Sequence, residues 1–502
     1  MSLAALFPLL LVLVGDAPHS ETWRGAIAAI VTVVTMLAAA LGNQGPSRLR
    51  WAERLRQALL EVALRPSAWL VLLLAAAIAY QVRKDDANSD DAPAHARPAT
   101  APSTISSSDP AHAASTDDDW PVERGSNRRH ARVGDAAGPR ATAPRRRWRF
   151  GRSDEAFYGS PAIRGNVVYA VGSETRQARV VAVSLEDGKL IWSGGPSDYR
   201  PTFAGPVVVG STLFAAEGLH STRQARVFAL DLRPRREGAL RWHVATASHV
   251  ECTPAVAEGR LYFNAGDDGV YGFHASLSDA WDAAPSPATR PLFHRPGGAM
   301  PDAETSLLVD GDRLYVGLGV GGQAVVQLDA ATGDERRRLA TPHPVFAPPA
   351  LYAERLFVGM GGGDYTNPAQ ARAGALWRLD AATLDVVWQR ELPATVLGAV
   401  IVDSTQVIVG CGDGRVLAYD HEGQVVARWN LGAPIAASLA LTPDFLYGVT
   451  HSGQLFALDR RRQEVAWQVS LGRPGHYMSG PIIVSDQLVL GTPHEGLVCY
   501  GP

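Results

Sequence analysis

Seven acidic, histidine and tyrosine side chains are candidates for chemistry or binding, because they precede or interrupt short apolar segments. They are Glu251, Glu304, His343, Asp364, Tyr365, His476 and Tyr477. A carboxylate pair such as Glu251 and Glu304 could bind a cation or act as general acid and base. A hard-cation site needs several convergent oxygens, however. We therefore interpret these residues as a solvated rim, and we expect no catalytic residue and no metal site.

Two glycine-rich stretches also resemble ligand-binding loops. The "GDDG" at 266–269 has residues that suit a calcium loop, but the same pattern is typical of a hairpin turn, which we favour. The "GMGGG" at 359–363 is similar to a phosphate-binding loop, yet neither a helix nor a lysine follows it. We assign no binding role to either stretch.

The composition restricts the classes of function. Among 502 residues, 19% are charged and 46% are hydrophobic, and the formal net charge is -3. This balance lacks the sustained basic surface of a nucleic-acid-binding protein. The three cysteines, Cys252, Cys411 and Cys499, lie far apart in apolar runs. We expect buried thiols rather than disulfides or a zinc site.

Residues 1–84 read as a membrane region. Apolar runs at 3–14, 25–41 and 68–82 are short but plausible spans, and the first could instead be a signal peptide. Five arginines separate the second run from the third, at positions 48, 50, 54, 56 and 65. Positive loops stay in the cytoplasm. The sequence therefore predicts two or three helices in the cytoplasmic (inner) membrane, with the rest of the chain on the periplasmic side.

Residues 85–146 differ sharply in composition from both neighbours. They are rich in Ala, Pro, Ser, Asp and Arg and contain almost no large apolar residue. Such a segment cannot bury enough surface to offset the entropy of ordering. We predict a disordered linker.

From residue 147 onward, short β-branched runs alternate with Gly, Asp and Asn turns. One unit recurs, most clearly as "VVQLDAATGDERRR" from Val325 and "LFALDRRRQEVAW" from Leu455. The residue before its Asp turn falls at 183, 230, 273, 328, 379, 419, 458 and 500, a spacing of about 39 to 55 residues. Eight four-stranded units of this period are typical of a β-propeller. We predict an all-β, eight-bladed propeller over 147–502.

The ends of this region predict how the ring closes. The eighth copy stops after Tyr500, before any fourth strand, whereas Trp148 and Phe150 look like a fourth strand that has no blade of its own. We expect the N-terminal segment to complete blade eight, because an open ring would leave an unpaired strand edge. In the other copies the fourth strand carries Trp192, Trp242, Trp388, Trp429 or Trp467, with Phe293 and Leu339 as substitutes.

The unit resembles the pyrroloquinoline-quinone (PQQ) repeat of eight-bladed propellers. "LDAATG" at 328–333 and "LDAAT" at 379–383 match that repeat closely. The resemblance implies one of two functions: quinoprotein dehydrogenases hold PQQ and calcium over the channel, whereas BamB-type assembly factors bind proteins and catalyse nothing. The dehydrogenases typically present an adjacent Cys-Cys pair, which this sequence lacks.

We therefore expect a membrane-anchored, periplasmic module that binds other proteins at the cell envelope, without enzyme activity, PQQ, calcium or nucleic acid. The alternative is a membrane-bound PQQ-dependent dehydrogenase that oxidises alcohols or sugars. Alternating strand directions place the connections between blades on the same face as those between strands two and three. This face, here called the entrance face, would carry the candidate residues and the long connections 173–179, 217–226 and 361–374, and we predict that partners bind there.

Overall fold

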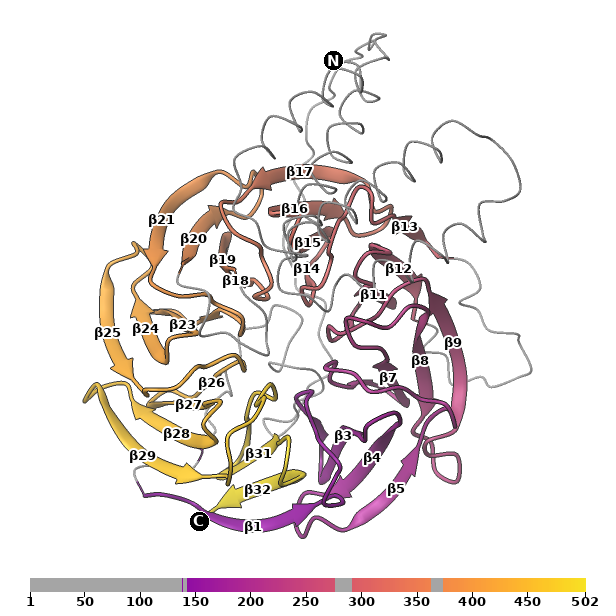
Figure 1. Cartoon of the computed structure of the whole chain (residues 1–502). Helices are drawn as coiled ribbons and strands as arrows, with labels where there is room; N and C mark the ends of the chain where they lie inside the picture. The colour runs from indigo at the N-terminus through magenta and orange to yellow at the C-terminus, as the bar shows by residue number, and fades with distance from the viewer. Residues whose placement is uncertain (1–137, 139–141, 276–290, 363–372) are drawn as a thin grey trace, which may run out of the picture. The chain divides into compact units, whose positions relative to one another are not determined.

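The computed structural model describes residues 138, 142–275, 291–362 and 373–502. These residues form 32 β-strands in eight four-stranded antiparallel sheets, arranged as blades around a central axis (Figure 1). In each blade the strand nearest the axis is short, and the outermost strand is the fourth in the blade. The described part of the chain thus confirms the predicted all-β, eight-bladed propeller.

The first four blades follow the chain in order. Blade one has β2 (Ala162–Arg164), β3 (Val167–Ser173), β4 (Ala178–Ser184) and β5 (Leu190–Gly194). Blade two has β6 (Val207–Val209), β7 (Thr212–Ala216), β8 (Ala225–Asp231) and β9 (Leu240–Thr246). Blade three has β10 (Ala255–Ala257), β11 (Arg260–Asn264), β12 (Val270–His274) and β13 (Phe293–Arg295). Blade four has β14 (Leu308–Asp310), β15 (Arg313–Leu318), β16 (Ala324–Asp329) and β17 (Glu335–Ala340).

The next three blades repeat this order, and the last one uses both ends of the described region. Blade five has β18 (Ala350–Tyr352), β19 (Arg355–Gly361), β20 (Gly374–Asp380) and β21 (Val386–Leu392). Blade six has β22 (Ile401–Val402), β23 (Val407–Gly410), β24 (Arg415–Tyr419) and β25 (Val425–Asn430). Blade seven has β26 (Ala440–Leu441), β27 (Phe445–Val449), β28 (Gln454–Asp459) and β29 (Glu464–Ser470). Blade eight has β30 (Ile482–Val484), β31 (Gln487–Gly491), β32 (Leu497–Gly501) and β1 (Arg145–Phe150).

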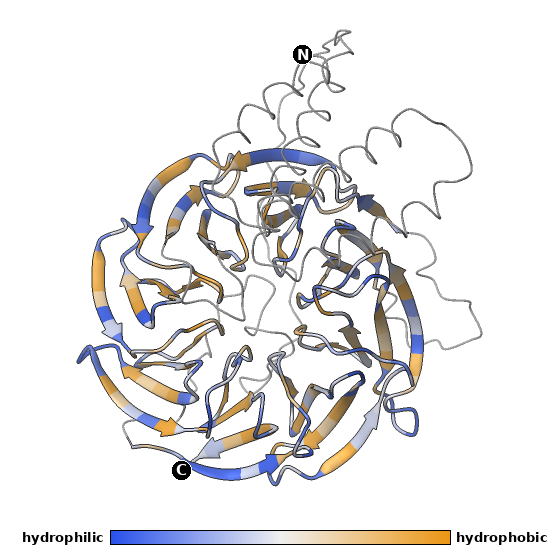
Figure 2. Ribbon diagram, viewed as in Figure 1, coloured by the Kyte–Doolittle hydropathy of each residue, from blue (hydrophilic) through white to orange (hydrophobic). Residues whose placement is uncertain are grey.

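Burial along the strands explains the sequence pattern. The second and third strands of each blade are mostly buried on both faces, as in β7 and β32, so their sequences are nearly continuous apolar runs. The fourth strands alternate buried and exposed residues, as in β9, and Figure 2 shows mixed blue and orange along the outer ring. In five blades an Asp makes the turn after strand three: Asp329 Oδ1, for example, accepts hydrogen bonds from the backbone N–H groups of Ala331 and Thr332 at 2.8 and 2.9 Å.

The fourth-strand tryptophans connect neighbouring blades. Trp388 Nε1 donates a hydrogen bond to the carbonyl of His421 in blade six at 2.9 Å, and its ring lies against Gly423 of that blade. Trp148 makes the matching contacts between blades eight and one: its Nε1 donates to the carbonyl of Leu185 at 2.8 Å, and a Cβ added to Gly188 would lie 2.8 Å from its indole. Trp148 and Trp388 therefore each join two blades through both packing and a hydrogen bond.

The ring closes where the sequence predicts. Strand β1 pairs antiparallel with β32, with Trp148 opposite Cys499 and Phe150 opposite Leu497, and the register shifts between Arg146 and Trp148. Here we call this pairing the seam. Tyr500 pairs with Arg146 and belongs to the large apolar core shared by blades seven, eight and one. The seam leaves neither terminal strand with an open edge toward the other.

Other predictions concern residues beyond the propeller. The proposed membrane helices at 1–84 and most of the linker at 85–146 lie outside the described residues, although the last linker residues, 145 and 146, belong to β1. No helix in the described part of the chain is long and apolar enough to cross a membrane. The three cysteines are buried thiols that form no disulfide within the described part of the chain.

Candidate functional site

Eight equivalent positions surround the channel on the entrance face, each four residues before the first residue of a blade's innermost strand. In blade order they are Tyr158, Phe203, Glu251, Glu304, Phe346, Leu397, Ala436 and Met478. Six of these eight described positions carry apolar or aromatic side chains. The two carboxylates occupy neighbouring blades, three and four, so the ring has one acidic sector in an otherwise apolar wall.

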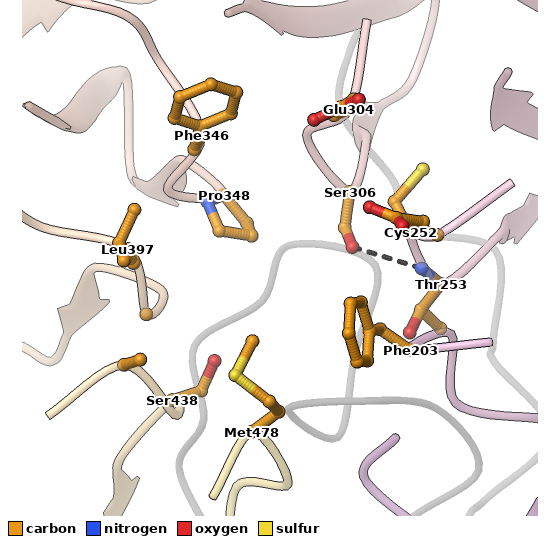
Figure 3. A pocket seen from close by; sticks show the side chains of 13 residues that line it. Phe203, Cys252, Thr253, Glu304, Ser306, Phe346, Pro348, Leu397, Ser438 and Met478 are labelled. Carbon is orange, nitrogen blue, oxygen red and sulfur yellow. Dashed lines mark hydrogen bonds between the residues drawn. The ribbon is translucent and has the colours of Figure 1, made fainter. Parts of the chain in front are cut away.

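All of these positions except Tyr158 line a cavity of about 70 Å³. Figure 3 shows Leu397 and Met478 across the cavity from Glu304, with Phe203 beside Thr253 and Phe346 in the blade that follows Glu304. Ser306 Oγ accepts a hydrogen bond from the backbone N–H of Thr253 at 3.2 Å, which ties the entrance of blade three to that of blade four. The cavity therefore offers apolar contact on one wall and carboxylate oxygens on the other.

Two histidines meet the carboxylate pair. Nδ1 of His220, from the β7–β8 connection, and Nε2 of His249, two residues before Glu251, each lie 2.7 Å from Glu304 Oε1. The four side chains can offer ligand atoms that all lie within 4.8 Å of one another. We call His220, His249, Glu251 and Glu304 the four-residue cluster. It can accept a cation, or it can pair an acid with a base.

The cluster corrects the expectation of a solvated rim. The side chains of His249 and Glu304 are only 3% and 7% exposed, and Glu251 Oε1 is buried. The cause is the position of Glu251 and Glu304: both precede the innermost strands, where neighbouring blades approach most closely. Only His220, whose side chain is 75% exposed, lies on the surface.

Burial and mutual repulsion shape the protonation of the carboxylates. Burial, followed by the charge of Glu304, raises the pKa of Glu251 to about 7. The same two causes raise the pKa of nearby Asp302 to about 6. Burial alone would also raise the pKa of Glu304, but hydrogen bonds and charge from His249 and His220 outweigh it and lower that pKa. Glu304 is thus the carboxylate that stays ionised, while Glu251 can hold a proton near neutral pH.

The imidazoles respond in the opposite sense. Burial would lower the pKa of His249, but its hydrogen bond to Glu304 and the charges of Glu251 and Glu304 raise it overall. Burial likewise opposes the rise in the pKa of His220, which the charge and hydrogen bond of Glu304 cause. Cationic imidazoles therefore partly balance the crowded carboxylates at moderately acid pH.

The "GDDG" stretch contacts His249 and the residue before Glu304. It is the turn between β11 and β12, as predicted. Gly266 has φ +50°, and a Cβ there would lie 2.5 Å from the ring of His249, so the backbone packs directly on that imidazole. Gly266 also exchanges backbone hydrogen bonds of 3.1 and 3.3 Å with Ala303, the residue before Glu304. This one turn positions ligand atoms from two blades.

The other predicted site residues do not join the cluster. His343 and His476 lie on the entrance face at the start of blades five and eight, and the His476 ring is 6.0 Å from the ring of His451. Tyr477 differs from the expectation: it is fully buried in the core, and its hydroxyl donates to the carbonyl of Arg473 at 3.0 Å, so a partner cannot reach it. Asp364 and Tyr365 lie outside the described residues.

Sequence reasoning missed His220 and His249. The Asp turn between strands three and four marks the repeats in the sequence, but it locates the outer strands and not the loops before strand one. Glu251 and Glu304 both stand four residues before the first residue of their blade's innermost strand, and His249 stands two residues before Glu251. His220 falls in the predicted connection 217–226, but no local motif marks it.

Comparisons with known proteins agree with the fold. Tetrathionate hydrolase of Acidithiobacillus ferrooxidans is 27% identical over 141 residues, which cover 24% of this chain and 28% of the relative's length. BamB of Moraxella catarrhalis superposes with a TM-score of 0.56 at 13% identity, over 72% of this chain and 100% of that one. Quinohemoprotein alcohol dehydrogenase of Comamonas testosteroni superposes with a TM-score of 0.59 at 12% identity, over 76% and 80% of the two chains.

A family model identifies the chain's relatives more directly. The PQQ-repeat model described as outer membrane protein assembly factor BamB matches residues 176–308 and 281–438, together more than half of the chain. The matched ranges include the repeats that contain Asp329 and Asp380. The chain therefore belongs to the PQQ-repeat family described as outer membrane protein assembly factor BamB.

Proposed function

We propose that the propeller is a membrane-anchored module on the periplasmic side of the inner membrane, where it binds another protein of the cell envelope through the entrance face. One observation carries this proposal: apolar side chains line most of the channel rim on that face. Tyr158, Phe203 and Met478 are partly exposed there, beside buried Phe346 and Leu397. A hollow of this kind accepts an apolar side chain of a partner.

Two further points support a protein partner. The family description names an assembly factor for outer membrane proteins. The arginine-rich loop between the second and third apolar runs favours export of everything after residue 84. We infer no role in nucleic-acid binding, because the net charge is -3.

A cross-linking experiment tests the partner site. A photo-reactive amino acid replaces Phe203 in the full-length protein, and in a second strain it replaces Val386, which is 42% exposed on the outer strand β21. We expect an envelope protein to cross-link at position 203 and not at 386. Phe203→Asp should then weaken binding of that purified partner at least tenfold, whereas Val386→Asp should not. Equal cross-linking at both positions, or equal affinity of both variants, contradicts the proposal.

The alternative is a PQQ-dependent dehydrogenase, and the carboxylate pair beside the channel is the observation that favours it. We propose that PQQ and calcium do not bind. The sequence has no adjacent cysteines, and the cavity of about 70 Å³ is far below the roughly 300–1,000 Å³ of most cofactor pockets. Calorimetry with PQQ and Ca²⁺, followed by dye reduction with alcohols and sugars, separates the two functions. Micromolar PQQ binding with turnover would favour the dehydrogenase.

A further inference from the structure

The four-residue cluster combines two imidazoles with two carboxylates at the channel rim, and its ligand atoms all lie within 4.8 Å of one another. We propose that His220, His249, Glu251 and Glu304 bind one divalent first-row transition metal ion, with Zn²⁺ as the representative ion. This inference is independent of the protein partner proposed above, because the propeller alone supplies every ligand.

The distances in the cluster suit an ion after a small adjustment. Zinc binds imidazole nitrogen at about 2.0–2.1 Å and carboxylate oxygen at about 2.0–2.2 Å. Glu304 Oε1 already lies 2.7 Å from both imidazole nitrogens. An ion between these atoms requires the two hydrogen bonds to open slightly, and it replaces the protons that now hold the three groups together.

Glu251 gives an independent reason to expect a cation. Its Oε1 atom is buried and has no hydrogen-bond partner among the described residues. A buried carboxylate oxygen without a donor or cation is unfavourable. This oxygen belongs to the ring position next to Glu304, so an ion held by Glu304 and the histidines would satisfy it.

Neighbouring residues fix the orientation of the proposed ligands through hydrogen bonds and packing. Ser248 Oγ lies 3.1 Å from His249 Nδ1 and can accept a hydrogen bond from Nδ1–H, which leaves the lone pair of Nε2 to face the cluster. The turn at Gly266 packs on the same imidazole and is hydrogen-bonded to Ala303, beside Glu304. Two ligands from different blades are therefore fixed by one rigid turn.

The ligand types select the class of ion. Calcium and magnesium prefer sites made entirely of oxygen, with six or more ligands in total. Two nitrogens and two carboxylate oxygens instead suit Zn²⁺, Mn²⁺, Fe²⁺ or Co²⁺. The two carboxylates also balance the charge of a divalent ion. Exposed His220 lies on a surface loop, so an ion can reach the buried ligands from solvent.

Metal binding can be tested on the full-length, untagged protein in detergent, after removal of metals with a chelator. Calorimetric titrations with Zn²⁺, Co²⁺, Ca²⁺ and Mg²⁺ measure the affinity and the stoichiometry. We expect one Zn²⁺ per chain with a dissociation constant in the micromolar range or below, d–d absorption of bound Co²⁺ typical of tetrahedral coordination, and no comparable binding of Ca²⁺ or Mg²⁺.

Variants then assign the site. Glu304→Gln and His220→Gln should each weaken Zn²⁺ binding by more than the roughly 10–100-fold cost of losing a second-shell partner. His220 is exposed, so its variant tests the ligand role even if Glu304→Gln fails to fold. The matched control is His476→Gln, because His476 stands six residues before β30 as His249 stands before β10. Absence of Zn²⁺ binding, or binding that neither ligand variant weakens, overturns the proposal.

Discussion

The seam gives a prediction whose magnitude follows from the structure. Trp148 is 7% exposed, and its indole donates a hydrogen bond to blade one. Truncating a buried tryptophan to alanine costs about 3–5 kcal/mol. Unfolding entropy is about 0.75 kcal/mol/K for a domain of roughly 350 residues. Trp148→Ala should therefore lower the melting temperature by about 4–7 °C.

A matched variant separates the seam from ordinary packing. Trp388 is also buried, with 9% exposure, and its indole also donates a hydrogen bond to the next blade. Unlike Trp148, it lies in a blade whose four strands are consecutive in sequence. Trp388→Ala should lose a similar amount of stability. Only Trp148→Ala should also release β1, because β1 has one neighbouring strand and precedes the rest of the ring in sequence.

Hydrogen exchange measured by mass spectrometry distinguishes the two outcomes. Peptides covering 145–150 and 497–501 should exchange faster in Trp148→Ala and at the wild-type rate in Trp388→Ala. A melting temperature within 1 °C of wild type in Trp148→Ala, together with unchanged exchange in both peptides, would refute the reasoning and show that the ring remains closed without this contact.

Three other changes have expected outcomes. Gly188→Ala should destabilise more than Gly165→Ala in thermal melts, because both glycines have positive φ but only at position 188 would a Cβ lie 2.8 Å from the indole of the seam. Burial lowers the pKa of His451 from 6.5 to about 4. The stability that the neutral, buried imidazole contributes is therefore complete above pH 6.5 and is lost as pH falls toward 4, because the unfolded chain binds the proton first. His451→Gln should reduce this acid-dependent fall in melting temperature between pH 6.5 and 4. Asp403→Asn should cost about 3–5 kcal/mol in urea unfolding, because it leaves Arg460, only 9% exposed and 2.6 Å from Asp403, without its charge partner.

The architecture was predictable because each blade repeats the same local chemistry. An Asp that closes the turn between strands three and four, as at Asp329, and an aromatic residue in strand four, as at Trp388, recur often enough to count the blades. The seam was also predictable from the number of strands. The eighth repeat ends after Tyr500 without a fourth strand, and the strand that contains Trp148 precedes the first repeat and has no blade of its own. Both inferences depend on contacts that are local or repeated.

The candidate site was only half predictable. Glu251 and Glu304 stood out because they are acidic residues before apolar strands, but their burial depends on how closely eight blades approach the axis. His220 reaches Glu304 across 84 positions of sequence. No periodic signal encodes a contact that occurs once in the ring, so the cluster becomes visible only when the blades are assembled.

The seam also has a consequence for biosynthesis. A ribosome makes β1 first among the propeller strands, yet this strand gains its only sheet partner when residues 497–501 appear. Blades one to seven can form one after another as the chain emerges. During this time the arginine-rich strand β1 has no sheet partner, and its Trp148 stays exposed. Premature termination shortly before Leu497 would therefore leave a nearly complete ring with two unmatched edges, a substrate for chaperones and proteases rather than a slightly shorter functional protein.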